Sequence, residues 1–460
     1  MKAMIQAALL VGLLAVGGYT STAWWIGMSA EKRLQQNEEQ LLNSASYLTL
    51  VSRDYQRGIF SSTEDVTYGI GGSMGQLLRT SGAGAALNYL QLTVHNDIQH
   101  GPLPGFRTAA FATIDSRLRP PPALRQAVDT ILHGQALLHA HAVLQWSGDS
   151  DISVASPSFQ YRLPDGTRLV WDGVAGSARA TAAMAHWSGH MNAPGLAVDG
   201  PKGHFELRGL TLSADMQRAL DTFYIGRSEV HLGSMTARDP NGTALSIQTM
   251  GIQSDTGLTA GYIDQYVSLS AEHVDVAPFS LTHVGYVQTL SHLHADSLAA
   301  LVTALRDAQR ELPSGPPTRV QTSRAQTTAF SRYGLALAAH EPVLNIERLG
   351  FVAPEGEFRL SAKLAVPGLS QQELQGPAAM AAVMMHLDAS AELHIDAPLL
   401  DKLLQASGKR GLVGSQLEQL EQQGYLRRDG NAFTTSLAFH AGALTINGLP
   451  YRPMTGTTMP

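Results

Sequence analysis

The sequence predicts an α+β fold that is mostly antiparallel β, in which one N-terminal transmembrane helix precedes a large strand-rich domain. Beyond residue 46, apolar and polar residues alternate in short runs, and this period of two is typical of antiparallel strands with one solvated face. The beginning of the chain differs, because residues 7–26 contain no charged side chain. A helix of that length, rising about 1.5 Å per residue, crosses a hydrocarbon core of about 30 Å.

The clearest strand pair surrounds Pro164-Asp165-Gly166. Residues 159–163 and 167–171 alternate on its two sides, and Asp-Gly between two such runs is a strong hairpin signal. Residues 205–212 and 358–364 alternate in the same way. Because strands and helices do not alternate regularly, these runs favour an antiparallel sheet over a parallel one.

The predicted helices are few and amphipathic. Residues 29–44 are expected to be helical, and later helices are expected near residues 121–132, 296–310, 371–383, 399–406 and 415–423. Asp296 is a candidate N-cap, Ser415 and Glu418 form a candidate capping box, and Gly424 is a candidate helix stop. So few helices cannot cover every strand. We therefore expect a curved sheet with an apolar inner face that serves an amphiphile or self-association.

The uncharged N-terminal run predicts an anchor over residues 1–28. Lys2 precedes the run, and Trp24 and Trp25 stand at its far end, where aromatic side chains anchor helices at a membrane interface. The alternative is a signal peptide cleaved at the small residues Ser21-Thr22-Ala23. Either interpretation exports the bulk of the chain, and the anchor predicts a single-pass protein of the bacterial inner membrane with its main domain in the periplasm.

A stretch that begins Leu-Pro-Ser-Gly-Pro-Pro predicts a linker or long loop over residues 312–328. It would separate a strand-rich region at 29–311 from a C-terminal α+β region at 329–460. The same stretch could merely connect strands of one domain, so the sequence leaves one domain or two open.

Composition excludes several classes of function. Only 15% of the residues are charged, and the net charge is −6, so no basic field exists that would attract nucleic acid. The chain has no Cys, which excludes disulfides, thiolate metal sites and Cys nucleophiles. No phosphate-binding Gly-rich motif is present in a strand–turn–helix setting, and no cofactor is expected.

Three local patterns follow one another in the chain. They are Tyr55-Gln56-Arg57-Gly58-Ile59-Phe60-Ser61-Ser62, then His100-Gly101-Pro102-Leu103-Pro104, and finally Gly442-Ala443-Leu444-Thr445-Ile446-Asn447-Gly448-Leu449-Pro450. With the N-terminal segment, their order resembles the YdgA family of bacterial inner-membrane proteins of unknown function. The resemblance implies a strand-rich periplasmic domain and no established activity. Its motif positions are Tyr55, Arg57, Gly58, Phe60, Ser61, Ser62, His100, Gly101, Pro102, Asn447 and Gly448.

These motif residues have a structural interpretation. Gly58 permits a tight turn between strands, after which Phe60 is expected to return to the core. Asn447-Gly448 is a turn signal directly after an alternating strand. Around His100, Gly and Pro fix a bend across which the imidazole could hydrogen-bond a backbone carbonyl.

Two patterns allow a chemical interpretation. Gly71-Gly72-Ser73-Met74-Gly75 matches the Gly-x-Ser-x-Gly motif of serine hydrolases, but that chemistry needs an α/β frame and later Asp and His partners. Two His pairs are spaced to share one face of a strand, His139 with His141 and His292 with His294, and His186 and His190 stand four residues apart. Two ligands do not make a metal site, so no metal ligand is predicted and these His are expected on polar strand faces.

The sequence therefore favours an envelope protein without catalysis that binds a partner protein or an amphiphile through an extended β-sheet surface. A serine hydrolase using Ser73 and a purely structural spacer are the alternatives. The expected partners are the lipid bilayer through residues 7–26, a second copy or an envelope protein, and an amphiphile, but not nucleic acid. The sequence does not identify the ligand or the physiological role.

Overall fold

A computed structural model describes residues 48–70, 91–310 and 333–451, with short gaps at 107, 121, 164, 202, 221–222, 243, 376–377 and 409, and also residues 31, 32, 35 and 42. The predicted transmembrane segment at 7–26, most of the predicted helix at 29–44, the Ser73 motif and the linker at 312–328 lie outside the described residues. Within the described part of the chain, no helix is both long and apolar enough to span a bilayer.

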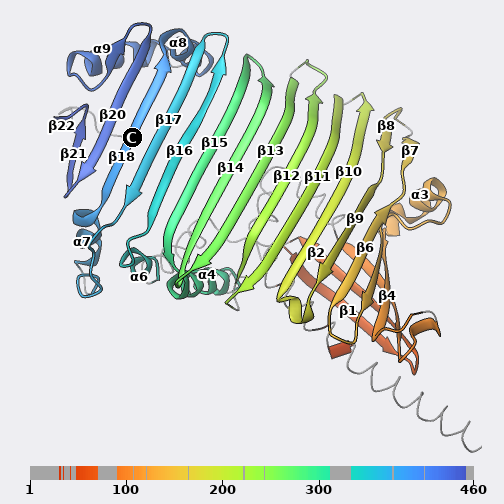
Figure 1. Cartoon of the computed structure of the whole chain (residues 1–460). Helices are drawn as coiled ribbons and strands as arrows, with labels where there is room; N and C mark the ends of the chain where they lie inside the picture. Colours follow the sequence, from red (N-terminus) through yellow and green to blue (C-terminus); the bar gives the residue numbers. More distant parts are fainter. Residues whose placement is uncertain are drawn as a thin grey trace, which may run out of the picture. The chain divides into compact units, whose positions relative to one another are not determined.

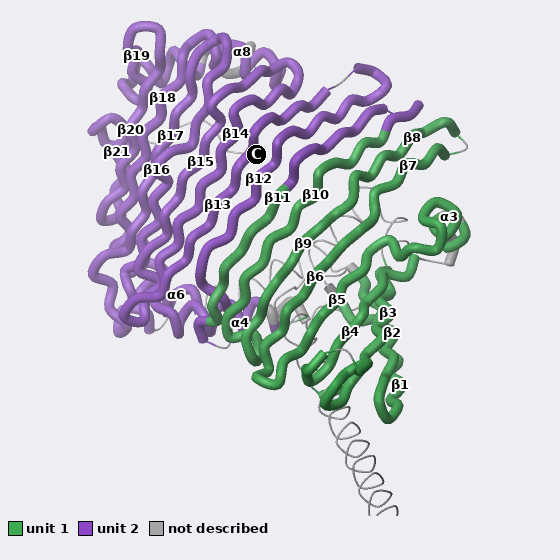
Figure 2. Tube along the Cα trace, turned by 45° about the vertical axis from the view of Figure 1, so that its right-hand side comes forward, with its two compact units in different colours: residues 1–198, 211–218 green, residues 199–210, 219–460 purple. Residues whose placement is uncertain are grey.

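The chain forms two compact units (Figure 2). Unit 1 contains residues 1–198 and 211–218, and unit 2 contains residues 199–210 and 219–460. Both are built mostly from antiparallel strands, as the sequence predicts. The predicted division of the chain at residues 312–328 remains a prediction.

Unit 1 is an antiparallel sheet in which each strand pairs with the next. Its strands are β1 (Leu48–Arg57), β2 (Ser61–Ile70), β3 (Leu92–His100), β4 (Ala112–Arg119), β5 (His139–Leu144), β6 (Ser150–Ser156), β9 (Val174–Ala180) and β10 (His186–Gly200). They pair in the order β1–β2–β3–β4–β5–β6–β9–β10. Helix α3 (Pro122–Leu132) joins β4 to β5, and two short 3₁₀ helices, η2 (Pro104–Phe106) and η3 (Ala182–Met184), lie in loops. Strands β10 and β11 (Gly203–Ala219) each have residues in both units.

The hairpin predicted around Asp165-Gly166 is confirmed. Strands β7 (Phe159–Arg162) and β8 (Arg168–Trp171) pair antiparallel. Gly166 has φ of +88°, a conformation that glycine adopts without the strain of a side chain. The core of unit 1 lies on one face of the sheet, where Ile98, Phe111, Ile114 and Leu144 are buried.

Unit 2 is also antiparallel, and its first strands are longer. Its strands are β12 (Phe223–Arg238), β13 (Ala244–Thr259), β14 (Tyr262–Val276), β15 (Phe279–His294), β16 (Val343–Ala353), β17 (Gly356–Ala365), β18 (Asp388–Asp396), β19 (Arg427–Asp429), β20 (Ala432–His440), β21 (Ala443–Ile446) and β22 (Leu449–Pro450). Neighbours in sequence pair from β12 to β18, then β18 pairs with β20, which is followed by β21 and β22. The short β19 pairs with β20.

The described residues of unit 2 include five helices: α4 (Ala295–Arg310), α6 (Leu335–Ala338), α7 (Ala379–His386), α8 (Ala397–Ala406) and α9 (Arg410–Gln422). Three predictions about them are wrong. Helix α4 begins at Ala295, so Asp296 lies inside its first turn and is not the N-cap. Helix α7 begins at Ala379 rather than 371, because Pro377 disfavours a helix through the residue before it. Helix α9 begins at Arg410, so Ser415 and Glu418 lie inside it and form no capping box. Gly424, with φ of +76°, follows the end of α9 as predicted.

The helices of unit 2 cover the two ends of its strands (Figure 1). Helices α8 and α9 lie at one end, and α4 and α6 lie at the other. At the first end, Leu399 and the strand residues Ile395 and Phe433 form a buried core. At the other end, Ile263 and Leu293 are buried with Leu298 and Leu337 packed against them. Both cores therefore sit at strand ends, and neither includes the middle of the sheet.

Candidate functional site

A row of apolar side chains runs across the middle of the unit 2 sheet, perpendicular to its strands. We call it the apolar row. Each member stands opposite the next in the strand register, and the members are Val230, Ile252, Leu269, Tyr286, Leu349, Leu360 and Leu393. Side chains that face one another in adjacent strands lie on the same face of a sheet. One member from each of seven strands therefore forms a continuous apolar band.

The apolar row is not sealed by the rest of the described chain. Leu349 is 37% exposed and the other six members are half-buried, so none reaches the burial of a core residue. No member belongs to either helix-covered core of unit 2. Leu364 and Leu437, on the same face, are 41% and 37% exposed. A fully buried core leucine would be almost without exposure, so this face has room for another apolar group.

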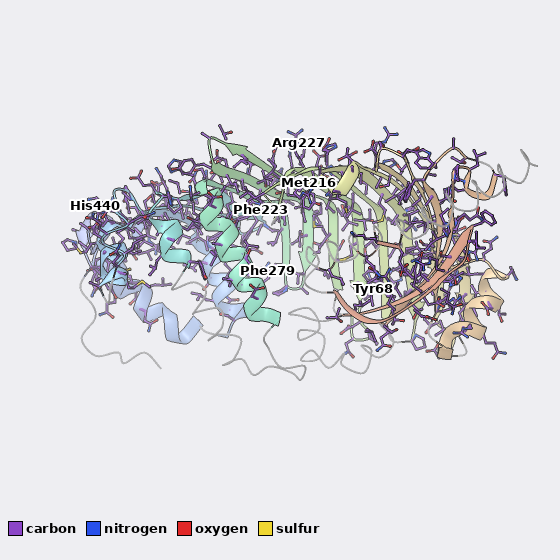
Figure 3. All side chains as sticks on the ribbon, turned by 90° about the horizontal axis from the view of Figure 1, so that it is seen from below. Tyr68, Met216, Phe223, Arg227, Phe279 and His440 are labelled. Carbon is purple, nitrogen blue, oxygen red and sulfur yellow. The ribbon has the colours of Figure 1, made fainter. Side chains whose placement is uncertain are left out.

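The opposite face of the same sheet is polar. Arg227 pairs with Asp255 at 2.9 Å, and Tyr266 and Thr289 continue that row across β14 and β15. In Figure 3, Arg227 lies on one side of the ribbon and helix α4 lies on the other. Across its middle the sheet is therefore amphipathic, with the Arg227–Asp255 pair on one face and helix α4 and the apolar row on the other.

Tyr286 is the one row member whose side chain has a polar atom, and that atom is paired. Tyr286 Oη donates a hydrogen bond to Gln288 Oε1. A polar group that is already paired costs little when water leaves its surroundings. No member of the apolar row is charged, and the Tyr286 hydroxyl would keep its hydrogen-bond partner when an apolar ligand covers it.

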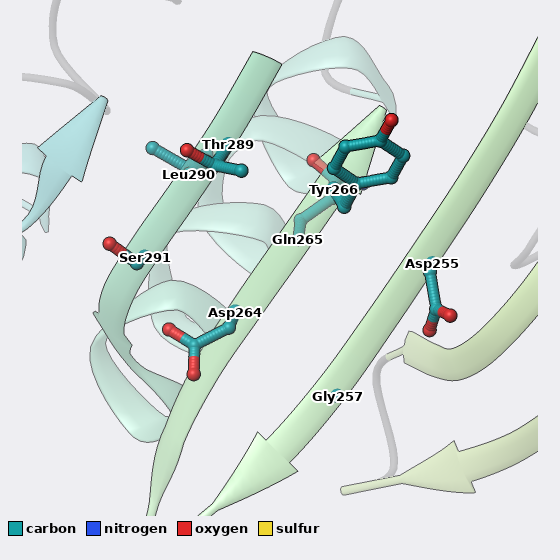
Figure 4. Close-up of a pocket in the computed structure, with 8 residues that line it drawn as sticks. All are labelled: Asp255, Gly257, Asp264, Gln265, Tyr266, Thr289, Leu290 and Ser291. Carbon is teal, nitrogen blue, oxygen red and sulfur yellow. The ribbon is translucent and has the colours of Figure 1, made fainter. Parts of the chain in front are cut away.

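Two pockets open on the polar face. One, of about 410 Å³, is lined by Asp255, Asp264, Tyr266, Thr289 and other residues of β13–β15 (Figure 4). Its carboxylates are engaged, because Asp255 pairs with Arg227 and Asp264 accepts the backbone N–H of His292 at 2.9 Å.

The other pocket, of about 750 Å³, contains arginines and glutamates in equal number together with His394 and Asn447. Arg359 pairs with Glu357 at 3.0 Å, and Arg427 donates to the Asn447 carbonyl at 2.9 Å. Because its charges balance, this pocket has no net preference for an anion or a cation.

The motif residues Tyr55, Ser62 and His100 lie close together in unit 1. Ser62 Oγ lies 3.1 Å from His100 Nε2, and both side chains are almost completely buried. Tyr55 packs against the core beside them, and burial raises its pKa. The two sequence motifs, 38 residues apart, thus form one buried polar cluster within β1–β3.

The hairpin turn explains Gly58 but corrects the expectation for Phe60. The N–H of Gly58 donates to the Ser61 carbonyl at 2.8 Å, and a Cβ at position 58 would lie 2.5 Å from that oxygen. Only glycine tolerates this approach. Phe60 is 43% exposed, so the prediction that it returns to the core is wrong. The turn carries Phe60 outward, and Tyr55 contacts the core instead.

The remaining motif residues of unit 1 lie around this cluster. Arg57, at the end of β1, contacts Glu31 at 3.5 Å, and the exposed Ser61 pairs with Gln99 in the register of β2 and β3. Gly101 has φ of +131° and directly follows His100, with the half-buried Pro102 next. These residues shape the bend that places His100 against Ser62.

Asn447 and Gly448 form a turn between β21 and β22, with φ of +52° and +81°. The side chain of Asn447 is buried and bonds to two other segments. Its Oδ1 accepts the N–H of Ser436 at 2.9 Å, and its Nδ2 donates to the Gly424 carbonyl at 2.8 Å. The turn predicted from the sequence is confirmed, and Asn447 also joins the end of α9 to β20.

The hydrolase alternative gains no support from the described residues. Ser73 lies outside them. The buried Ser62–His100 pair is closed to a substrate, because Ser62 is 3% and His100 is 1% exposed. A nucleophile must reach its substrate at a contact distance, so this pair is structural.

The predicted His pairs lie on strands as expected. His139 and His141 of β5 both contact Asp115 Oδ1, at 3.2 and 2.9 Å. Burial alone would raise the pKa of Asp115, but the hydrogen bonds and charges of His141 and His139 hold it below its usual range. His186 contacts Asp215 at 2.6 Å, and His190 contacts Ser177 at 3.3 Å.

The third pair, His292 and His294 of β15, meets residues that the sequence did not connect with it. His292 stacks on Tyr262 at 4.1 Å, and His294 stacks on His340 at 3.9 Å. Among all described residues, no group of three or more His, Asp or Glu is arranged to hold a metal ion.

Together, these features define a class of protein: a strand-rich chain whose second unit presents an amphipathic antiparallel sheet with an open apolar row. The chain belongs to the DUF945 family, described as bacterial proteins of unknown function, and the family model matches residues 1–454. No curated protein and no solved structure matches the chain.

Proposed function

We propose that this protein is a membrane-anchored envelope protein, without catalytic activity, that binds the acyl chain of an amphiphile along the apolar row. The observation that carries the proposal is the row itself, which is open in the middle of a sheet whose ends are covered by helices. Apolar surface left in water costs about 25 cal/mol per Å². A ligand that covers the row removes this cost.

The dimensions of the row suit an acyl chain. Seven strands at about 4.8 Å spacing make a band of about 29 Å. One leaflet of a bilayer core of about 30 Å is about 15 Å thick, so the row could hold an extended acyl chain along its length. A peptide laid there would bring amide groups that find no partner on an apolar face, which is unfavourable. An acyl chain has no such groups.

The location belongs to the same proposal. The uncharged run at residues 7–26 and the resemblance to the YdgA family support an inner-membrane anchor with the two units in the periplasm. A chain tethered in this way keeps its sheet close to a supply of acyl chains, since a tether raises the effective concentration of its surroundings.

The test is photo-crosslinking in vesicles. The full chain is reconstituted with phosphatidylethanolamine that carries a diazirine in its acyl chain, and crosslinked peptides are mapped by mass spectrometry. We expect crosslinks on peptides that contain Leu349, Leu360 and Leu393. Leu349→Glu should reduce them several-fold, because a carboxylate is costly next to hydrocarbon.

The matched control is Ser390→Glu, which adds the same charge at an exposed position opposite Lys363 on the other face. It should leave crosslinking unchanged. Crosslinks confined to residues 7–26 would contradict the proposal. Protein–protein crosslinks between two copies at the same three leucines would instead assign the row to self-association.

A further inference from the structure

Helix α7 carries apolar side chains on the side where a surface helix normally carries polar ones. Met380, Met384 and Met385 are 58%, 44% and 57% exposed, and Ala381 between them is also exposed. At about 100° per residue these four positions form one contiguous face. We call it the methionine face.

The other side of α7 is held against the unit. Ala379 is buried, and Ala382, Val383 and His386 are half-buried. His386 donates from Nδ1 to the Pro367 carbonyl at 3.0 Å and from Nε2 to Glu373 at 3.1 Å. The methionine face is therefore presented by a fixed helix. A surface helix that is apolar on all sides normally has its outer side covered.

Helix α7 directly precedes β18 and lies at the same end of the strands as α6 (Figure 1). Ala389, the first apolar-face residue of β18, stands opposite the exposed Leu364 on one side and Phe439 on the other. Met385 Sδ lies 3.2 Å from the position that a Cβ would take at Gly442, in the β20–β21 turn. The methionine face is thus next to the same sheet edge at which the apolar face of β17, β18 and β20 ends.

We propose that the methionine face inserts into the surface of a lipid bilayer, where an acyl chain passes from the membrane to the apolar face of the sheet. The second part of this proposal, the passage of an acyl chain to the sheet, rests on the proposed function. Methionine is flexible and adapts to irregular apolar surroundings. The single ionisable side chain of α7 is His386, which lies outside the methionine face and is paired with Glu373. An anionic headgroup or a charged partner surface would be met by basic or polar groups, and the methionine face offers neither, whereas its uncharged side chains suit the hydrocarbon of a bilayer.

A neutral apolar contact has a specific signature. Binding driven by charge weakens with salt and needs anionic lipid. Insertion of the methionine face should be the same at low and high salt, and the same in phosphatidylcholine vesicles with or without phosphatidylglycerol.

The absence of Cys from the chain permits a clean test. The full chain with Ala381→Cys is labelled with an environment-sensitive fluorophore and reconstituted into vesicles that contain a doxyl-labelled lipid. We expect the fluorophore at 381 to be quenched, and a fluorophore at Ser390→Cys, exposed on the polar face, to remain unquenched. Met384→Cys is a second labelling position.

The triple variant Met380→Gln, Met384→Gln, Met385→Gln keeps the side-chain length and helix propensity while removing apolar surface. It should reduce the membrane-inserted fraction at 381 at least about tenfold. Replacing the three methionines by Leu should restore insertion. The matched control replaces three exposed leucines outside α7, Leu163, Leu220 and Leu258, by Gln. It should leave the quenching of the fluorophore at position 381 unchanged.

The outcomes separate the two proposals. Absence of quenching at both labelled positions of α7, or quenching unaffected by the triple Gln variant, would overturn the membrane contact. If quenching at 381 is normal while acyl crosslinks never reach Leu349, Leu360 or Leu393, α7 is a membrane contact and the acyl-binding function fails. If both are present, the triple Gln variant should also slow the appearance of crosslinks on the apolar row.

Discussion

The imidazole rings of His294 and His340 stack with their centroids 3.9 Å apart and their planes 12° from parallel. His294 directly precedes α4, and its Nδ1 accepts the backbone N–H of Ser297 at 3.4 Å. The neighbouring His292 donates from Nδ1 to the His340 carbonyl at 2.8 Å. Side chains of β15 therefore join the start of α4 to the segment that follows α6.

This arrangement predicts that acid loosens the segment at residues 333–341. Burial, and then the charges of His294 and His292, hold the pKa of His340 below its ordinary value of 6.5. The folded state therefore takes up this proton less readily than the unfolded state. The stabilising contribution is present above pH 6.5 and is lost as the pH falls below it toward the folded pKa. The ring of Tyr262 faces His340, and Asp264 accepts the backbone N–H of His292. Within the described part of the chain, no carboxylate forms an ion pair with His340.

Hydrogen exchange measures this effect. Amide protection over residues 333–341, corrected for intrinsic exchange, should fall between pH 7.5 and 5.5. His340→Phe keeps an aromatic ring in the stack but cannot titrate, so its protection should vary less with pH. Equal pH dependence in the wild type and His340→Phe would refute the role of His340.

A second prediction concerns His386, whose pKa is shifted in the direction opposite to that of His340. Its hydrogen bond to Glu373, together with that to the Pro367 carbonyl, raises its pKa above 6.5. Hydrogen bonds from the Ser370 side chain and backbone, and then from His386, lower the pKa of Glu373 to about 2. The attraction between protonated His386 and ionised Glu373 is present below pH 6.5 and weakens as the pH rises through the raised pKa of His386. In acid it persists until Glu373 is protonated, at about pH 2.

An NMR titration of His386 in the full chain tests this pair. Glu373→Gln should bring the pKa of His386 back toward 6.5, whereas Glu341→Gln, which removes a carboxylate that binds Gly368 N instead, should leave it raised. An unshifted pKa for His386 in the wild type would show that the pair does not form in solution.

Asn447→Ala should destabilise the protein by about 3 kcal/mol. The change removes the side-chain hydrogen bonds to Ser436 and to the Gly424 carbonyl, together worth about 2 kcal/mol, and places an ordinary residue at positive φ, which costs about another 1 kcal/mol. Asn447→Asp tolerates that backbone and keeps the acceptor for Ser436 N, so its effect should be smaller. Urea unfolding of the full chain gives the difference. The exposed Asn241→Ala is the control, and an equal effect at both sites would contradict the role of Asn447.

Ser62→Ala should destabilise unit 1 by about 1–2 kcal/mol, because it leaves the buried His100 Nε2 without the Ser62 hydroxyl. The adjacent Ser61 is exposed, and Ser61→Ala should change stability by less than about 0.5 kcal/mol. Both variants are compared by hydrogen exchange of β1–β3. Similar effects of the two substitutions would show that burial of the Ser62–His100 pair does not matter.

Features that depend on neighbours in sequence were predictable. The Asp165-Gly166 hairpin, the Asn447-Gly448 turn and the end of α9 before Gly424 all form where predicted. Their residues have intrinsic preferences for the required backbone angles, and these preferences act within a few residues. The capping box at Ser415 fails for the complementary reason, since a local signal cannot tell a helix start from a helix interior.

The sequence by itself determined that the chain is strand-rich and that its strands alternate between an apolar and a polar face. Only the tertiary structure decided which apolar residues stand together. Val230 and Leu393 belong to one row because seven strands pair in a particular register, and a shift of one residue would turn a whole strand to the other face. The same holds for Asp115 beside His139 and for His340 against His294. Such contacts depend on strand pairing between distant segments, which alternation within each segment does not specify.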